Sequence, residues 1–185
     1  DMRTRFVKTL TPVAEAVRLA KTPDRAPVIF SDAGDNPGGG GSGRTTELLS
    51  ALVAAEAENL FYGSFFDPEL AEEAHSLGAG ARFFARFNRT TGGNPWDAWD
   101  HPLEAEATVE ALHDGDVIGR LGIVAGRTLK LSRAALLRIG GIRVVVISDR
   151  AQTADPVLFE MFGLEIGAAH TVVVKSRGHF RAGFL

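Results

Sequence analysis

Short apolar segments alternate with amphipathic ones along most of this chain, and this alternation constrains the fold more than any other feature. The apolar segments are long enough for a buried strand and too short for a helix: residues 27–30, 60–66, 142–147 and 171–174. Stretches with helical spacing lie between or beside them, at residues 10–21, 45–57 and 67–78. Buried strands separated by helices are typical of a sheet covered on both faces. The pattern predicts an α/β fold with three layers.

The middle of the chain has a different pattern of apolar and polar residues. Residues 103–111 (LEAEATVEA) alternate apolar and polar side chains, as a half-exposed antiparallel strand does. Glycines then separate further short strands up to about residue 139. A chain of 185 residues favours one domain. We therefore expect a single α/β domain over residues 1–185, with a mixed sheet and an antiparallel β insertion.

Composition excludes several classes of protein. The chain has no cysteine, which rules out disulfides, thiolate zinc sites and a cysteine nucleophile. Its net charge of −3 does not suggest a nucleic-acid partner, and no apolar run approaches the roughly 18 residues of a membrane span. The expectation is a soluble, cytoplasmic protein that binds neither nucleic acid nor membrane.

A glycine-rich segment, residues 35–45 (DNPGGGGSGRT), lies between an expected strand and an expected helix. In that position backbone N–H groups can form a cradle for an anion. The segment also fits the dinucleotide and phosphate-loop patterns loosely, but consecutive glycines fit many patterns, and Arg44 stands where a phosphate loop has lysine. A surface loop that uses glycine only to relieve strain is the alternative.

Basic residues follow the last apolar segment. If the chain stays extended there, Lys175, Arg177, His179 and Arg181 project from one face at a period of two. Such a row could bind a carboxylate or phosphate, or orient a carbonyl group. The alternative is a solvated edge strand whose charges discourage aggregation.

No metal site or catalytic constellation is complete in this chain. The histidines lack the spacing of known zinc motifs, and Asp97, Asp100 and His101 form the nearest approach to a ligand cluster. Such a cluster is more often a polar loop than a metal site. We expect no metal ligands and no cofactor in this chain.

Three stretches, residues 27–49, 141–155 and 171–184, resemble the C-terminal domain of the MlrC family of metallopeptidase-like microcystin-degradation proteins. The resemblance implies that residues 1–185 are this C-terminal domain, and that a larger N-terminal domain carrying the zinc ligands is absent from the chain. Zinc is then expected in that N-terminal domain, which would act as partner in cis or in trans. A homo-oligomer is also left open.

The resemblance implies a function as well. The chain would be the cleft-forming part of a zinc-dependent metallopeptidase or amide hydrolase, inactive alone, acting on a peptide or small amide. Two alternatives stay open: a stand-alone anion- or nucleotide-binding module that uses the Gly38–Gly43 loop, and a non-catalytic interaction domain.

The family motifs assign candidate roles to individual residues. His179, Lys175 and Arg181 are candidates for binding a substrate carboxylate or stabilising an oxyanion. Substrate or anion contacts are expected from the glycine segment and the segment after residue 147, namely Asp35, Asn36, Gly38, Gly39, Gly40 and Gln152, with Arg150 a weaker candidate. Arg44 departs from the family pattern, where an acidic residue is usual.

Overall fold

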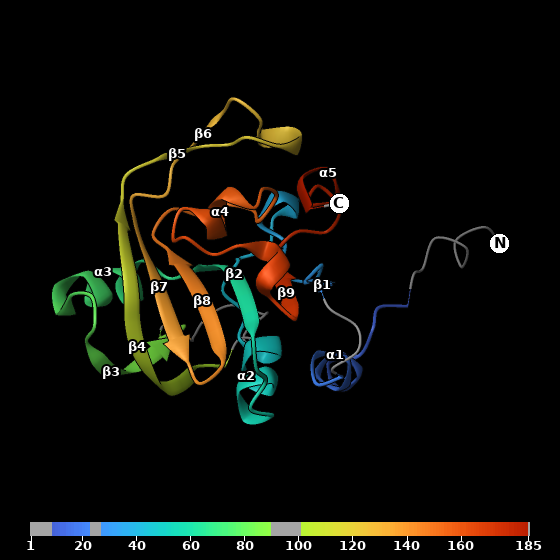
Figure 1. Cartoon of the computed structure of the whole chain (residues 1–185), viewed down its shortest axis with the longest axis horizontal. Coiled ribbons are helices and arrows are strands. Elements are labelled where there is room, and N and C mark those ends of the chain that lie inside the picture. The colour runs from blue at the N-terminus through green and yellow to red at the C-terminus, as the bar shows by residue number, and fades with distance from the viewer. Residues whose placement is uncertain (1–8, 23–26, 90–100, 185) are drawn as a thin grey trace.

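The computed structural model describes residues 9–22, 27–89 and 101–184, and its centre is a seven-stranded mixed sheet (Figure 1). The strand order is β1-β9-β2-β8-β7-β4-β3. The strands are β1 (Val28–Ser31), β2 (Leu60–Phe66), β3 (Arg82–Phe87), β4 (Leu103–Asp114), β7 (Arg133–Ile139), β8 (Ile142–Ile147) and β9 (Thr171–Val174). Two further short strands, β5 (Val117–Ile118) and β6 (Thr128–Leu129), form a separate ribbon beyond one end of the sheet.

The sheet is parallel in one half and antiparallel in the other. Strands β1, β9, β2 and β8 run parallel, and these are the four apolar segments of the sequence. Strands β7, β4 and β3 add antiparallel neighbours to β8. On β4, Ala105 and Ala107 are buried while Glu104 and Glu106 are exposed, which confirms the predicted alternation. The mixed sheet with an antiparallel part is therefore confirmed.

Helices cover both faces of this sheet. On one face lie α1 (Val13–Ala20), α2 (Glu47–Ala54) and α3 (Pro68–Leu77); on the other lie α4 (Val157–Glu160) and α5 (Arg181–Phe184). Strand β2 shows the division, since Tyr62 packs in the core under the first group and Phe61 in the core under the second. None of the described helices has the length and apolar character that a membrane crossing requires.

Three short 3-10 helices complete the described elements: η2 (Pro37–Gly39), η4 (Gly122–Val124) and η5 (Ile166–Ala168). The longest helix, α3, begins where local chemistry favours a start. Asp67 Oδ1 accepts a hydrogen bond from the Leu70 N–H at 3.0 Å, and Pro68 occupies the first turn. The other carboxylate oxygen of Asp67 accepts from the Asn88 N–H at 2.9 Å, which fixes the end of β3 beside the helix.

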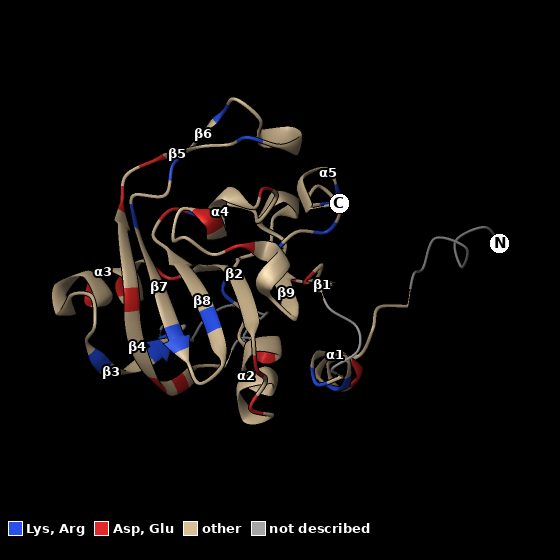
Figure 2. Ribbon diagram, viewed as in Figure 1, with Lys and Arg blue, Asp and Glu red and all other residues tan. Residues whose placement is uncertain are grey.

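The charged residues of the antiparallel half pair across strands. Figure 2 shows acidic positions on β4 beside basic positions on β3, β7 and β8. Glu110 lies 2.9 Å from Arg138 Nε and 2.7 Å from Arg143 Nε, and Glu104 lies 3.3 Å from Arg86. These pairs partly neutralise the charges on this surface of the sheet.

Candidate functional site

The candidate residues meet at the carboxyl ends of the parallel strands. Strand β1 ends at Ser31 and leads into the glycine segment; β8 ends at Ile147 and leads to Gln152; β9 ends at Val174 and leads to Lys175 and His179. In open α/β sheets, ligands bind at this edge because loops from several strands converge there. The topology thus brings together three segments that are far apart in the sequence.

Lys175 lies at the base of this convergence and is completely buried. Its Nζ atom donates to Asp35 Oδ2 at 2.6 Å, to Asp32 Oδ2 at 3.0 Å and to the Thr45 carbonyl oxygen at 3.3 Å. The rings of Tyr62 and Phe65 each lie 5.6 Å from the ammonium. Burial disfavours the charged form, but the carboxylates of Asp32 and Asp35 outweigh it and raise the pKa of Lys175 above its ordinary value.

Asp35 ties the glycine segment to this lysine. One carboxylate oxygen accepts from the Gly43 N–H at 2.7 Å and from Ser42 Oγ at 3.0 Å; the other accepts from the Thr45 N–H at 2.8 Å, from Thr45 Oγ1 at 3.0 Å and from Lys175. Burial alone would raise the pKa of Asp35, but Lys175 and the backbone donors lower it to about 2. The segment is therefore held in place by a carboxylate whose two oxygens both accept several hydrogen bonds.

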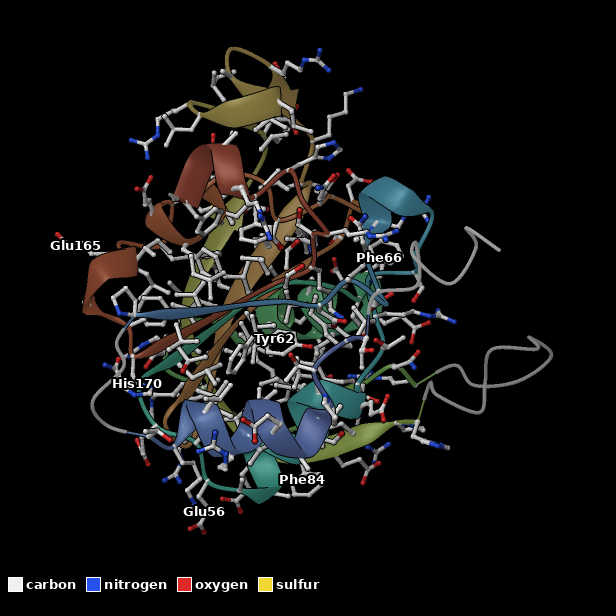
Figure 3. All side chains as sticks on the ribbon, turned by 90° about the vertical axis from the view of Figure 1, so that its right-hand side faces the viewer. Glu56, Tyr62, Phe66, Phe84, Glu165 and His170 are labelled. Atoms are coloured by element: carbon white, nitrogen blue, oxygen red, sulfur yellow. The ribbon has the colours of Figure 1, made fainter. Side chains whose placement is uncertain are left out.

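Tyr62 borders the same cluster from β2. It lies in the interior of the domain, whereas Glu56, Glu165 and His170 lie toward the outside (Figure 3). Its hydroxyl has no hydrogen-bond partner among the described residues, and burial raises the pKa of this phenol above its ordinary value. Tyr62 therefore stays neutral beside the ion pairs.

Sequence reasoning missed the roles of Asp32, Thr45, Tyr62 and Ser176. The sequence holds one indication of the role of Asp32, because Asp32 directly follows β1 just as Lys175 directly follows β9. Ser31 of β1 pairs in register with Val174 of β9, so the two following residues face each other. That signal needs the pairing of β1 with β9, which the local pattern does not provide.

A second cluster lies toward solvent and joins Gln152, Ser176 and His179. The Gln152 Nε2 atom donates to Ser176 Oγ at 2.6 Å and lies 3.1 Å from His179 Nδ1; Gln152 Oε1 is 3.2 Å from the same nitrogen. Ser176 is buried and His179 is exposed. Two of the predicted candidates, Gln152 and His179, are thus in contact.

The glycine segment packs against this cluster at Gly38. A Cβ atom added there would lie 2.7 Å from Gln152 Cδ, and closer still to Oε1. Only glycine leaves the space that the Gln152 amide occupies.

The predicted cradle of free N–H groups is not what the structure shows in this segment. The Gly38 N–H donates to Asn36 Oδ1 at 3.1 Å, the Gly39 N–H to the Asn36 carbonyl at 3.0 Å, and the Gly40 N–H to the Pro37 carbonyl at 3.1 Å. Asn36 therefore caps the short helix η2, and the loop satisfies its own donors. Contacts of Asn36, Gly38, Gly39 and Gly40 with a substrate stay a prediction.

The four basic residues after β9 do not form one row. The strand ends at Val174, Lys175 points inward, and the burial of Ser176 and Phe180 turns the chain into α5. His179 and Arg181 are exposed, and the Arg181 guanidinium lies 5.9 Å from the Phe180 ring centroid. The alternative of a solvated edge strand is also wrong, because β9 lies between β1 and β2.

The donor set in the described part of the chain does not fit a zinc ion. No three histidine, aspartate or glutamate side chains come together there as metal ligands would. Asp97 and Asp100 of the predicted loop cluster lie outside the described residues. No chemical step is therefore assigned to a metal held by these residues.

Comparisons with known proteins identify a family for this chain. Residues 30–185 match the family model described as MlrC C-terminus. Microcystinase C from Sphingomonas sp. is 30% identical over 171 residues, which cover 92% of this chain and 32% of that protein. A crystal structure of a "Putative metallopeptidase" from Mesorhizobium sp. BNC1 superposes with a TM-score of 0.81 at 24% identity, covering 97% of this chain and 35% of the other, and supports the fold. The chain thus spans about a third of the length of these relatives. Its match over most of its length shows that the chain belongs to the MlrC C-terminus family.

Proposed function

We propose that this chain forms one wall of the active-site cleft of a zinc-dependent metallopeptidase or amide hydrolase, and that it supplies substrate and oxyanion contacts. The observation that carries the proposal is the convergence of Gly38, Gln152 and His179 at the carboxyl edge of the parallel strands. Three loops meet there although their residues are far apart in the chain. Membership of the MlrC family supports the choice of a peptide or small amide as substrate.

His179 is the group best placed to contact the reacting atoms. It is exposed at the edge of the cluster, and its Nε2 atom makes no hydrogen bond within the described part of the chain. A donor fixed beside a developing oxyanion stabilises the transition state of amide hydrolysis more than the ground state. Arg181, two residues further and also exposed, is suited to binding a substrate carboxylate.

Lys175 and Asp35 act at a distance from the substrate in this proposal. Both are buried and bonded to each other, so they position the loops on which His179 and Gly38 lie. We assign them a positioning role rather than a direct catalytic one. The predicted contacts of Lys175 and Asp35 with substrate would require this pair to open.

Zinc and its ligands belong, in this proposal, to an N-terminal domain that acts in cis or in trans. The described residues here offer no set of three metal-binding side chains. The chain alone is therefore expected to be inactive. The anion-binding alternative has less support, because the amides of Gly38, Gly39 and Gly40 already donate within the loop.

The proposal is tested by joining this chain to the N-terminal part of Microcystinase C, in place of the part that it matches, and measuring hydrolysis of a linear peptide with zinc present. The chain alone should show no hydrolysis, and the fusion should restore it. In the fusion, His179→Ala should lower kcat/KM by about 100-fold or more. Arg177→Ala is the matched control, since Arg177 is also an exposed basic residue of the same loop.

Three results would contradict the proposal. Hydrolysis by the metal-free chain alone would show that the catalytic apparatus lies elsewhere in these residues. Equal activity of the His179→Ala and Arg177→Ala fusions would remove His179 from the site. A fusion that folds, binds zinc and stays inactive would favour a non-catalytic interaction domain.

A further inference from the structure

We infer that Ser64 and Thr153 are positioning residues, which together hold the loop after β8 so that the Gln152 side chain reaches His179. Both are completely buried, so they act on the site through Gln152 rather than by touching a substrate. Their effect on hydrolysis rests on the proposed function. Their effect on the contact between Gln152 and His179 is a property of this chain and can be measured on the chain alone.

The first part of this arrangement is an irregularity in β2. The pairing of β2 with β8 shifts register between Tyr62 and Phe65, and Ser64 lies within the shift. The Ser64 backbone N–H donates to Thr153 Oγ1 at 2.6 Å, which is a side chain of the loop and not a strand neighbour. Irregularities of this kind are frequent next to active sites, where they redirect a group of the strand. Here the irregularity offers the loop after β8 a donor fixed in the sheet.

The two hydroxyl groups complete the arrangement, and each has a defined direction. Ser64 Oγ lies 3.0 Å from the Ala151 carbonyl oxygen, which only accepts, so Ser64 donates its one hydroxyl proton there. Thr153 Oγ1, 3.3 Å from Ser64 Oγ, is then the donor of that contact. Thr153 Oγ1 also accepts from the Lys175 N–H at 3.3 Å. Ser64 thus binds the residues on both sides of Gln152, and Thr153 joins this loop to the end of β9.

Gln152 has little room of its own between these two held residues. Its amide lies 3.1 Å (Nε2) and 3.2 Å (Oε1) from His179 Nδ1, and Nε2 lies 2.6 Å from Ser176 Oγ. On its other side, a Cβ atom at Gly38 would lie 2.7 Å from Gln152 Cδ. The contact with His179 therefore depends on where the backbone of residues 151–153 is held. A displacement of about 1 Å at a site can cost about 100-fold in rate.

The test on the chain alone follows the NMR signals of the His179 ring at constant pH. Gln152→Ala removes the amide and defines how far these signals move when the contact is lost. Thr153→Val replaces the hydroxyl by a methyl group, so the signals should move toward their Gln152→Ala positions. Thr153→Ser keeps the hydroxyl and should leave them close to their original positions. The double variant Thr153→Val with Gln152→Ala should move the signals no further than Gln152→Ala does, because Thr153 acts through Gln152.

Thr171→Val is the matched control. Thr171 is also a completely buried threonine, but it begins β9, whereas the candidate site lies at the other end of that strand, and its Oγ1 lies 3.0 Å from His170 Nδ1. This substitution should move the His170 signals and leave those of His179 in place. In the fusion with the N-terminal part of Microcystinase C, Thr153→Val should lower kcat by about tenfold or more with little change in KM. Thr153→Ser should restore most of the loss, and Thr171→Val should keep kcat unchanged.

The inference fails if Thr153→Val leaves the His179 signals in place, or if Thr171→Val moves them equally. Further movement in the double variant would also overturn it, because Thr153 would then act on His179 by a route other than Gln152. Should Thr153→Val not fold, Ser64→Ala decides the question, since it removes the hydroxyl that binds Ala151. Signals that respond as expected in a chain whose fusion hydrolyses no peptide would overturn the proposed function and leave the positioning role standing.

Discussion

The Lys175 ammonium lies 2.6 Å from Oδ2 of Asp35 inside the domain, and this pair joins the end of β9 to the glycine segment that follows β1. Both partners keep their charge, because the pKa of Asp35 is lowered to about 2 and the pKa of Lys175 is raised. Removing one charge leaves the other buried without its counterion. This buried ion pair thus anchors the loops of the candidate site to the core.

Lys175→Met should destabilise the domain strongly. Two carboxylates, Asp35 and Asp32, would then face each other without a cation, and the expected loss is about 3–5 kcal/mol in the free energy of unfolding. Urea unfolding followed by circular dichroism measures it. Arg181→Ala, which removes an exposed cation, should change the same quantity by about 0.5 kcal/mol or less. Equal effects of the two substitutions would show that the buried pair contributes nothing to stability.

Acid should weaken the domain through Asp35. Its pKa is lowered from 3.8 to about 2 in the folded state, so its contribution is complete above about pH 4 and is lost as the pH falls toward 2. The contribution is about 2 kcal/mol. Asp35→Asn should therefore flatten the dependence of unfolding free energy on pH in this window. Glu165→Gln, an exposed control, should leave the slope unchanged, and an unchanged slope in Asp35→Asn would refute the assignment.

Gly63→Ala should overpack the core beneath α4. A Cβ at position 63 would lie 2.5 Å from Cζ and 2.8 Å from Cε1 of Phe159, whose ring is fully buried. The expected loss is about 1–3 kcal/mol. Phe159→Leu in the same chain should recover part of it, which a double-mutant cycle of urea unfolding detects as a favourable coupling. Strict additivity of the two substitutions would contradict the contact.

Asp155 should control how the β5–β6 ribbon is held. Its Oδ2 atom accepts from the N–H groups of Arg120 and Leu121 at 2.6 and 2.7 Å, and Oδ1 accepts from the Val157 N–H at 2.9 Å. Asp155→Ala removes these acceptors, so the amides of Arg120 and Leu121 should exchange at least tenfold faster with solvent deuterium. Amides in β8 should keep their protection. Unchanged exchange at positions 120 and 121 would mean that the ribbon is fixed by other contacts.

Much of the fold could be predicted from the sequence because the signals are local. Continuous apolar runs such as residues 142–147 are typical of strands buried on both faces, and the structure has β8 there. The alternation in residues 103–111 predicts a half-exposed strand, and β4 extends over Leu103–Asp114. The glycine segment lies between β1 and α2, as its sequence context predicts.

The candidate site could be predicted only in part. Likeness to the family named Gln152, His179 and Gly38 as candidates, and the structure brings these three together. The direction of Lys175 could not be predicted, since its position after a strand fits an exposed row as well as a buried ion pair. Whether such a lysine turns inward depends on which strand lies beside β9 and on the carboxylates that follow it.

By itself, the sequence determined where strands and helices form, since periodicity and turn residues act over a few neighbouring positions, and it determined the family through its motifs. Only the tertiary structure decided that Asp32 and Asp35 enclose Lys175. It also decided that Asn36 accepts a hydrogen bond from the Gly38 N–H, and that the Gln152 side chain passes Gly38 to contact His179. These relations join loops after β1, β8 and β9. They are set by the order of strands in the sheet, a property of long-range pairing that no local pattern encodes.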